Sequence, residues 1–262
     1  MKYLQLEKEF FHFIAGAVRN LVSNPNKNMA AQHKKEGDIF TQVDIDVENF
    51  IVSEIKKRFP QDRILAEENH ADTVIQKGRI WIIDPICGTN NFSRGIKNFC
   101  TNIALVDNNQ LIASCVIDHS QNDYLWSIGN GEIYVNTNLF QLSEKRFNTL
   151  IEVDFGSVVS VDKKQQEKHN RFLKKMITET NYYLISLNSS LGFAYVAIRK
   201  MDGFINIYNH PWDICASSFL IQQAGGVITD LTGKPWTLAS VGAIAAKNKD
   251  IHKKLLETFL NS

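Results

Sequence analysis

The sequence predicts an α+β fold made of two layered halves. Two patterns with helical spacing come first, and short apolar runs separated by turn residues follow them. From about residue 146, apolar runs alternate with helical patterns. The first arrangement is typical of helices packed on an antiparallel sheet, and the second is typical of an α/β layer. We therefore expect an N-terminal α+β half over residues 1–145, a C-terminal α/β half over residues 146–262, and a cleft between them.

The first half begins with two expected helices. Residues 1–22 place apolar side chains along one side of a helix, and an Asn-Pro-Asn sequence ends that pattern. Within residues 44–59 an apolar residue recurs at every fourth position, so we expect a second helix that ends before Pro60. The polar stretch between these helices, residues 26–37, is expected to be a mobile loop.

Short strands are expected next, in an antiparallel meander. The run at residues 79–83 is mostly apolar and ends abruptly at Asp84-Pro85. Turn sequences such as Asp-Asn-Asn and Gly-Asn-Gly separate the later runs. Further strands are expected over residues 99–106, 111–118, 124–128 and 132–135.

The second half alternates between the two kinds of element. Strands are expected over residues 150–155, 182–186, 203–208, 227–229 and 243–246. Helices are expected over residues 163–178, 189–201, 211–224 and 250–260. The sequence contains no linker or low-complexity segment, so the two halves are expected to pack closely.

The composition excludes several classes of protein. In 262 residues, 44% are hydrophobic and 22% are charged, as in globular proteins rather than disordered or fibrous ones. The 29 basic and 28 acidic side chains leave a net charge of +1, so no overall field attracts nucleic acid or an anionic membrane. The four cysteines form no C-x-x-C pair, and the sequence has neither a secretory-signal pattern nor a long apolar run. We expect a reduced, cytoplasmic protein without nucleic-acid or membrane partners.

Residues 81–92, Trp-Ile-Ile-Asp-Pro-Ile-Cys-Gly-Thr-Asn-Asn-Phe, carry the clearest indication of chemistry. An apolar strand delivers the Asp84 carboxylate to its end, and a proline fixes the turn that follows. Gly88 permits close approach of a ligand to the backbone, and Thr89 adds a hydroxyl beside exposed N–H groups, which suits a phosphate. Taken alone, the same residues also fit an ordinary strand end followed by a turn.

Three other positions place carboxylates at the ends of expected elements. Glu67 and Glu68 follow a short apolar run, although paired glutamates are often only solvated. Asp213 lies at the start of a helix, directly after a Pro-Trp pair, and Asp44 begins another helix. Either aspartate could serve only as a helix cap, so these residues alone allow both capping and function.

Together these motifs resemble those of the inositol monophosphatase family, within the superfamily that includes fructose-1,6-bisphosphatases. The matching segments, in chain order, are Asp38-x-x-Thr-x-x-Asp44, Glu67-Glu68, Trp81-Ile-Ile-Asp-Pro-Ile-x-Gly-Thr-x-Asn-Phe92, His210-x-Trp-Asp213 and Gln223-Ala-Gly-Gly226. Five motifs in register make chance similarity very improbable. The resemblance implies a layered α-β-α-β-α sandwich, a site in the cleft between the halves, and a homodimer.

The resemblance also implies an activity. Members of the family hydrolyse phosphate monoesters by direct attack of a metal-activated water, with Mg²⁺ as the metal and Mn²⁺ as an expected substitute. Asp44 and Thr89 would orient the water, and the N–H groups of Gly88 and Thr89 would bind the phosphate. The metal ligands implied by position are Glu67, Asp84, the carbonyl of Ile86, and Asp213. We expect the substrate to be a small phosphorylated metabolite, an inositol phosphate or a sugar phosphate.

Cys87 departs from the family motif, which has a second aspartate at this position. A thiol is softer and shorter than a carboxylate, and in its protonated form it is a poor ligand for Mg²⁺. Three alternatives follow. The enzyme works with a weakened second metal position, the thiolate recruits a softer metal such as Mn²⁺ or Zn²⁺, or catalysis is lost and the protein only binds a phosphorylated ligand.

Two expected substrate-binding positions also differ from the inositol-specific members. Asn206 replaces a glutamate that contacts ring hydroxyls, and Asn188-Ser189-Ser190 replaces a Gly-Thr-Ala segment. The latter is also an ordinary N-cap sequence. The resemblance therefore leaves the identity of the phosphate ester open. In addition, Lys34 or Lys35 could reach the rim of the cleft and attract an anionic substrate.

Overall fold

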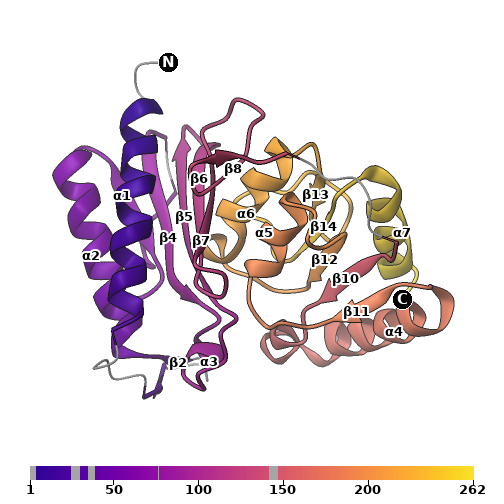
Figure 1. The fold of residues 1–262 in the computed structure, drawn as a ribbon. Helices are drawn as coiled ribbons and strands as arrows, with labels where there is room; N and C mark the ends of the chain where they lie inside the picture. The colour runs from indigo at the N-terminus through magenta and orange to yellow at the C-terminus, as the bar shows by residue number, and fades with distance from the viewer. Residues whose placement is uncertain (1–3, 25–29, 35–38, 76, 142–146) are drawn as a thin grey trace.

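The computed structural model describes residues 4–24, 30–34, 39–75, 77–141 and 147–262, which form five layers (Figure 1). Helices α1 (Leu4–Val22) and α2 (Gln42–Arg58) cover one face of a seven-stranded sheet. Helices α5 (Leu191–Ala197) and α6 (Pro211–Gln223) lie between this sheet and a five-stranded one. Helices α4 (Lys163–Glu179) and α7 (Lys249–Leu260) form the outermost layer. The expected α-β-α-β-α sandwich is confirmed.

The seven-stranded sheet is largely the expected meander. Its spatial order is β3 (Arg63–Ala66), β4 (Arg79–Cys87), β5 (Cys100–Asp107), β6 (Gln110–Asp118), β7 (Asp123–Ser127), β8 (Tyr134–Val135) and β9 (Asn138–Leu139). From β4 onward each strand is antiparallel to the next. The exception is β3, which pairs with β4 in parallel. Parallel pairing brings the carboxyl ends of β3 and β4 to the same edge of the sheet, and Glu67 follows β3 at that edge.

The five-stranded sheet combines parallel and antiparallel pairs. Its spatial order is β11 (Tyr183–Ile185), β10 (Leu150–Val153), β12 (Gly203–Asn206), β14 (Ala243–Ala246) and β13 (Val227–Thr229). Strand β10 is parallel to both β11 and β12, whereas β14 is antiparallel to β12 and β13. The 3₁₀ turn η1 (Gly156–Ser160), which follows β10, was not predicted.

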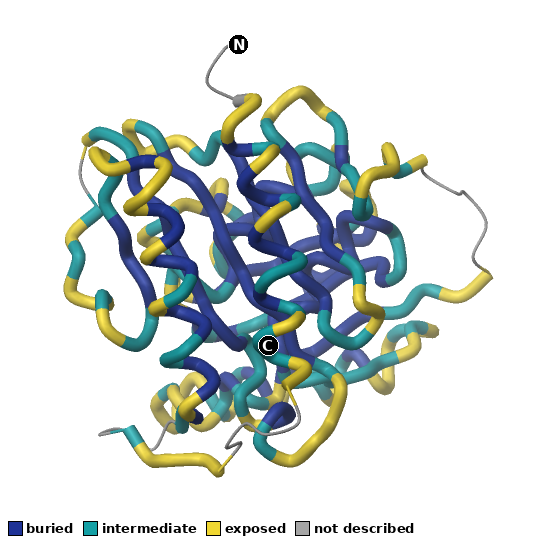
Figure 2. Tube along the Cα trace, turned by 60° about the vertical axis from the view of Figure 1, so that its left-hand side comes forward, coloured by how far each residue is buried: buried dark blue, intermediate teal, exposed yellow. Residues whose placement is uncertain are grey.

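Both sheets are covered on both faces, which explains their continuous apolar runs. Along β4, Ile80 and Ile82 pack in the core that contains α5 and α6, while Trp81 and Ile83 pack in the core beneath α1 and α2. The buried stretches run through the strands, and exposed residues gather on turns and outer helix faces (Figure 2). A strand with two buried faces cannot show polar alternation.

The predicted end of the 79–83 strand is wrong. Strand β4 continues through Asp84 to Cys87, with a bulge between these residues, because Cys87 pairs with Cys100 of β5. The bulge changes the direction of the strand directly after Asp84, whose carboxylate lies at this end of β4.

Two further predictions need correction. The loop expected over residues 26–37 includes β1 (Gln32–His33), which pairs with β2 (Ile39–Phe40), and the rest of that loop lies largely outside the described residues. The helix expected over residues 189–201 is shortened to α5. The chain leaves the helix at Ile198, and Arg199 then adopts a left-handed backbone conformation with φ of +60°.

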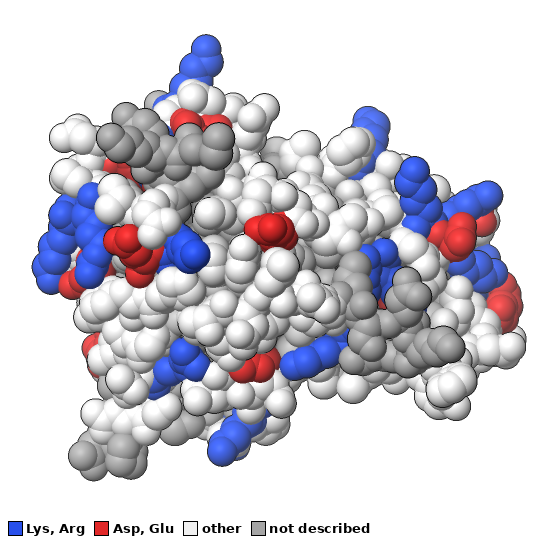
Figure 3. Space-filling model, turned by 45° about the horizontal axis from the view of Figure 1, so that its top comes forward, with Lys and Arg blue, Asp and Glu red and all other residues white. Residues whose placement is uncertain are grey.

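The surface agrees with the near-zero net charge. On the face shown in Figure 3, basic and acidic side chains of the described residues are interspersed rather than gathered by sign. Among the described residues, the helices are too short or too polar to cross a bilayer.

Candidate functional site

Donor atoms from distant parts of the sequence converge where β4 ends and α6 begins. A carboxylate oxygen of Asp84, the Sγ atom of Cys87 and a carboxylate oxygen of Asp213 all lie within 4.8 Å of one another. Glu67, which follows the parallel neighbour β3, is close enough for its charge to act on Asp84. The site thus joins the edge of the first sheet to the first turn of a helix from the second half.

Asp84 occupies the most demanding position in this cluster. The residue is 1% exposed, and its Oδ1 atom has no hydrogen-bond partner among the described residues. Burial raises the pKa of Asp84 well above its usual value, and the nearby Cys87, Glu67 and Asp213 raise it further. A buried carboxylate oxygen without a partner is costly unless the group is protonated or a cation joins it. The unpartnered oxygen therefore marks a candidate cation site.

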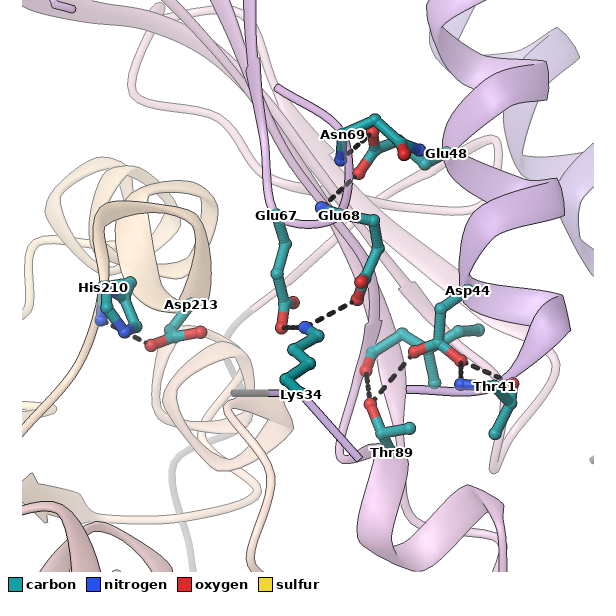
Figure 4. A network of polar contacts seen from close by, with 11 residues as sticks. Lys34, Thr41, Asp44, Glu48, Glu67, Glu68, Asn69, Thr89, His210 and Asp213 are labelled. Carbon is teal, nitrogen blue, oxygen red and sulfur yellow. Dashed lines mark hydrogen bonds and ion pairs between the residues drawn. The ribbon is translucent and has the colours of Figure 1, made fainter. Parts of the chain in front are cut away.

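Asp213 caps α6 and also contributes to the cluster. Its Oδ2 atom accepts a 2.6 Å hydrogen bond from the backbone N–H of His210 (Figure 4). The His210 ring stacks on Trp212 with 4.6 Å between ring centroids, so the histidine orders this loop. This capping bond holds the Asp213 carboxylate beside Asp84. Asp213 can therefore be both a helix cap and a member of the cluster.

Asp44 and Thr89 form a hydrogen-bonded pair beside the end of β4 (Figure 4). The single proton of the Thr89 hydroxyl faces two acceptors, Asp44 Oδ1 at 3.0 Å and the backbone oxygen of Ile86 at 2.9 Å. Asp44 Oδ2 accepts bonds of 2.9 and 2.5 Å from the N–H and hydroxyl of Thr41, which completes the capping box of α2. Burial raises the pKa of Asp44, although the bonds from Thr41 and Thr89 lower it. Asp38, from the same sequence motif, lies outside the described residues.

Lys34 bridges the glutamate pair after β3. Its Nζ atom lies 2.6 Å from Glu67 Oε1 and 2.8 Å from Glu68 Oε1 (Figure 4). Burial lowers the pKa of Lys34, but the two glutamates outweigh this and raise it well above its usual value. Burial and the charge of Glu67 raise the pKa of Glu68 to about 7. The glutamate pair thus binds the Lys34 ammonium directly, whereas the sequence suggested only that Lys34 or Lys35 could reach the rim of the cleft. Lys35 lies outside the described residues.

Glu48 of α2 was not predicted from the sequence, yet it shapes the turn that carries Glu67. Its buried carboxylate accepts hydrogen bonds of 2.6 and 2.8 Å from the backbone N–H groups of Glu68 and Asn69. Its spacing from Asp44, four residues or one helical turn, was the available signal.

Gly88 makes the turn after β4 possible. Its φ of +100° lies in the region that other residues rarely adopt. A Cβ atom there would also lie 3.0 Å from the Cβ of Ser189 and 3.1 Å from the backbone oxygen of Asn98. This close approach places Thr89 and the short helix α3 (Thr89–Phe92) against the second half of the molecule.

Cys87 is half-buried and is held in its protonated form. Its hydrogen bond with the Cys100 thiol, followed by burial, raises the pKa of Cys87 well above its usual value. Its sulfur accepts a hydrogen bond of 3.3 Å from the backbone N–H of Ser190. A protonated thiol is a poor ligand for a hard cation. The part of the cluster around Cys87 and Asp213 therefore offers fewer usable donors than the part around Asp84 and Glu67.

Ser190 links Cys87 to the first turn of α6. It precedes α5 as the N-cap residue, but its hydroxyl makes no capping bond, contrary to an ordinary N-cap sequence. Instead its Oγ atom accepts a 2.9 Å hydrogen bond from the Asn102 amide, which also donates to the Asp213 backbone oxygen at 3.0 Å.

The other expected substrate-binding residues are Asn206, Asn188 and Ser189, and Ser189 lies beside Gly88. The Asn206 amide donates a 3.0 Å hydrogen bond to Asp154, and its buried Oδ1 atom has no partner among the described residues. Asn188 adopts a left-handed conformation with φ of +55°. Ser189 accepts a 3.1 Å hydrogen bond from the N–H of Leu191 at the start of α5.

The donor set fits a hard divalent cation in one part of the cluster. Glu67, Asp84 and the Ile86 carbonyl offer oxygen ligands, which Mg²⁺ prefers, and a cation would satisfy the unpartnered Asp84 oxygen. Around Cys87 and Asp213, the thiol does not fit Mg²⁺. The structure thus brings Asp84, Cys87 and Asp213 together, and the assignment of Glu67 and the Ile86 carbonyl as further ligands stays a prediction.

Comparisons with known proteins identify the family of this chain. The model of the family described as "Inositol monophosphatase family" matches residues 5–262. The chain is 34% identical over 204 residues to the "Fructose-1,6-bisphosphatase/inositol-1-monophosphatase" of Thermotoga maritima, which covers 77% of this chain and 75% of the relative. It is 29% identical over 242 residues to the "Inositol-1-monophosphatase" of Bacillus subtilis, over 92% and 86% of the two chains. The solved structure of a Thermotoga maritima IMPase matches with a TM-score of 0.80 and 27% identity, over 100% of this chain and 98% of that one. This chain belongs to the inositol monophosphatase family.

Proposed function

We propose that the protein is a divalent-metal-dependent phosphatase that hydrolyses a small phosphate monoester, an inositol phosphate or a sugar phosphate. The observation that carries the proposal is the buried, unpartnered Oδ1 atom of Asp84, beside Asp213 and Glu67. Membership of the family supports the reaction class. The choice of Mg²⁺, with Mn²⁺ as a substitute, follows from the oxygen ligands around Asp84.

The proposed metal ligands are Glu67, Asp84, the Ile86 carbonyl and Asp213. When bound, the metal would supply positive charge to the attacking and leaving oxygens of the phosphate ester. Thr89 would orient the attacking water and accept its proton, while its own hydroxyl proton passes to Asp44 along the existing 3.0 Å hydrogen bond. The N–H groups of Gly88 and Thr89 would bind the phosphate oxygens.

A second candidate function rests on Cys87. With a protonated thiol in place of a carboxylate, the cluster has less negative charge, and the protein could bind a phosphorylated ligand without hydrolysing it. The two functions share one ligand chemistry and differ in whether phosphate is released. A variant that restores the carboxylate separates them.

Phosphate release from a panel of inositol and sugar phosphates, with Mg²⁺ or Mn²⁺, tests the proposed function. We expect release by the unaltered protein and a loss of more than about 100-fold in Asp84→Asn, beyond the loss typical of outer supporting residues. Asp72→Asn, at an exposed carboxylate, is the matched control and should retain activity. No release from any ester with either metal would contradict the proposal.

Cys87→Asp measures how far the thiol limits the site. We expect tighter metal binding and faster phosphate release, because the added carboxylate contributes charge beside Asp84 and Asp213. Release that appears only in Cys87→Asp would favour the binding function for the unaltered protein. An unchanged rate in this variant would show that the thiol does not limit turnover.

A further inference from the structure

Cys87 and Cys100 face each other across two antiparallel strands. Beyond the bulge in β4, Cys87 is the register partner of Cys100, the first residue of β5. Directly opposed residues in an antiparallel pair have Cα atoms about 4.5–5.5 Å apart. Disulfides span Cα separations of about 4.4–6.8 Å, so the backbone already holds these residues at a suitable spacing.

The two side chains point to the same place. The Cys100 thiol is close enough to Cys87 to raise the pKa of the Cys87 thiol, and both sulfurs contact Ser190. Its backbone N–H lies 3.3 Å from Cys87 Sγ, and its hydroxyl lies 3.7 Å from Cys100 Sγ. Contact of both sulfurs with one residue shows that the side chains converge, in addition to the backbone pairing.

The two thiols differ in access to small reagents. Cys87 is half-buried at the cluster of Asp84 and Asp213, whereas Cys100 is fully buried. A partly accessible thiol that contacts a buried one is the arrangement in which the first reacts with an oxidant and the second resolves the product. Cys115 lies in a different core, beneath α1 and α2, and Cys215 lies on α6.

We propose that Cys87 and Cys100 form a reversible disulfide under peroxide, and that this pair is an oxidation site of the protein. The juxtaposition of two thiols at the end of β4 and the start of β5 carries this inference. It does not depend on the proposed phosphatase activity.

The reaction balances with hydrogen peroxide as the oxidant. As the Cys87 sulfur attacks one peroxide oxygen, its thiol proton leaves and the O–O bond breaks. A sulfenic acid forms, and the departing hydroxide takes up that proton as water. The Cys100 sulfur then attacks the Cys87 sulfur, the S–O bond breaks, and a second water leaves with the Cys100 proton. Two thiols are oxidised by two electrons, and one peroxide is reduced to two waters.

The disulfide has a consequence for the neighbouring cluster, and this step rests on the proposed function. Bonding would draw the Cys87 sulfur toward β5 and fix the bulge that carries Asp84 and precedes Gly88. Asp84 and Thr89 lie within three residues of Cys87 along the chain, so their placement depends on this bulge. We expect oxidation to weaken Mn²⁺ binding by roughly 10-fold, the lower range for a disturbed supporting residue.

Thiol counting and intact-protein mass spectrometry test the disulfide without any assay of activity. The denatured, reduced protein should show four thiols. After peroxide we expect two thiols and a mass lower by two hydrogen atoms, both reversed by dithiothreitol. Proteolytic mapping should join the peptides that contain Cys87 and Cys100.

Two variants test the assignment of the disulfide to Cys87 and Cys100, so that a folding defect in one variant does not decide the result. The double variant Cys115→Ser/Cys215→Ser keeps the pair and should still lose two thiols. Cys100→Ser should lose the cross-link and instead gain oxygen on Cys87. Four thiols retained after peroxide, a cross-link between other cysteines, or added oxygen on Cys87 in the unaltered protein would each overturn the proposal.

Mn²⁺ titration by calorimetry of the reduced and oxidised forms tests the consequence separately. Weaker binding in the oxidised form, restored by dithiothreitol, is expected. Equal affinities would overturn the effect on the cluster. Failure of the proposed phosphatase function would leave the thiol count and the cross-link map unchanged, so the two failures are distinguishable.

Discussion

At the scale of single residues, a carboxylate can cap a helix and still belong to a site, because it has two oxygens. Asp44 uses one oxygen for Thr41 and the other for Thr89, and Asp213 caps α6 while it faces the cluster. Asp84 is as buried as Asp44, but one of its oxygens has no partner among the described residues. That unpartnered oxygen, rather than the residue type, makes Asp84 a candidate cation ligand.

A second buried carboxylate, Glu152 of β10, predicts a pH dependence of stability. Its Oε1 atom accepts a 2.9 Å hydrogen bond from Leu187 N–H, and Oε2 has no partner among the described residues. Burial, with a further contribution from the charge of Asp154, raises the pKa of Glu152 to about 8. The unfolded chain ionises near the usual value of 4.5, so the folded state loses stability as the pH rises from that value toward about 8. Each pH unit in this window costs about 1.4 kcal/mol.

Glu152→Gln should remove this contribution, because glutamine cannot ionise and still offers an oxygen to Leu187. Urea unfolding at a series of pH values between about 5 and 8 measures the free energy of unfolding of both proteins. The unaltered protein should show the steeper decline. Parallel curves would contradict the assignment to Glu152.

At the scale of elements, periodic patterns located most helices, and local geometry decided where elements end. The expected ranges of α2, α4, α6 and α7 lie within about two residues of the observed ends, and α1 ends at Val22 as expected. Residues 1–3, the expected start of α1, lie outside the described residues. The same reasoning overextended α5, because Arg199 turns the chain with a positive φ. It also ended β4 too early, because pairing with Cys100 beyond the bulge depends on β5.

Close packing of α5 predicts that Gly192→Ala destabilises the protein. A Cβ atom at Gly192 would overlap Glu152 Oε2 and lie 2.5 Å from Phe204 Cε2. We expect a loss of about 3 kcal/mol, the upper range for overpacking a core, measured by urea unfolding. Gly16→Ala in α1 is the matched control, because its Cβ would meet nothing within 4 Å. It should stabilise the protein by about 0.5–1 kcal/mol, and equal effects of the two substitutions would contradict the packing argument.

At the scale of the whole molecule, the two predicted halves correspond to different sheets but share one core. The strands of the seven-stranded sheet precede residue 145 and those of the five-stranded sheet follow it. Helices α5 and α6, from the second half, pack against both sheets. The division into residues 1–145 and 146–262 stays a prediction, and the shared core argues that the halves fold together.

We also propose that the protein forms a homodimer, as membership of the family leads us to expect. Light scattering coupled to size-exclusion chromatography should give twice the chain mass of 29.8 kDa. The dimer should persist in the metal-free protein if the interface lies apart from the cluster. The mass of a single chain at all micromolar concentrations would contradict this proposal.

The sequence by itself determined the order and type of most elements, its resemblance to a known family implied the layered fold, and its motifs named the acids and threonine of the proposed site. These follow from periodicity and from short motifs whose residues are close in the chain. The tertiary structure decided what depends on distant contacts. The parallel pairing of β3 with β4 brings Glu67 to Asp84, Lys34 and Glu48 hold the glutamate turn, and Cys87 meets Cys100. These contacts join residues that are far apart in the sequence, so local sequence patterns do not predict them. The burial of each side chain and the charges around it are set only when the layers assemble.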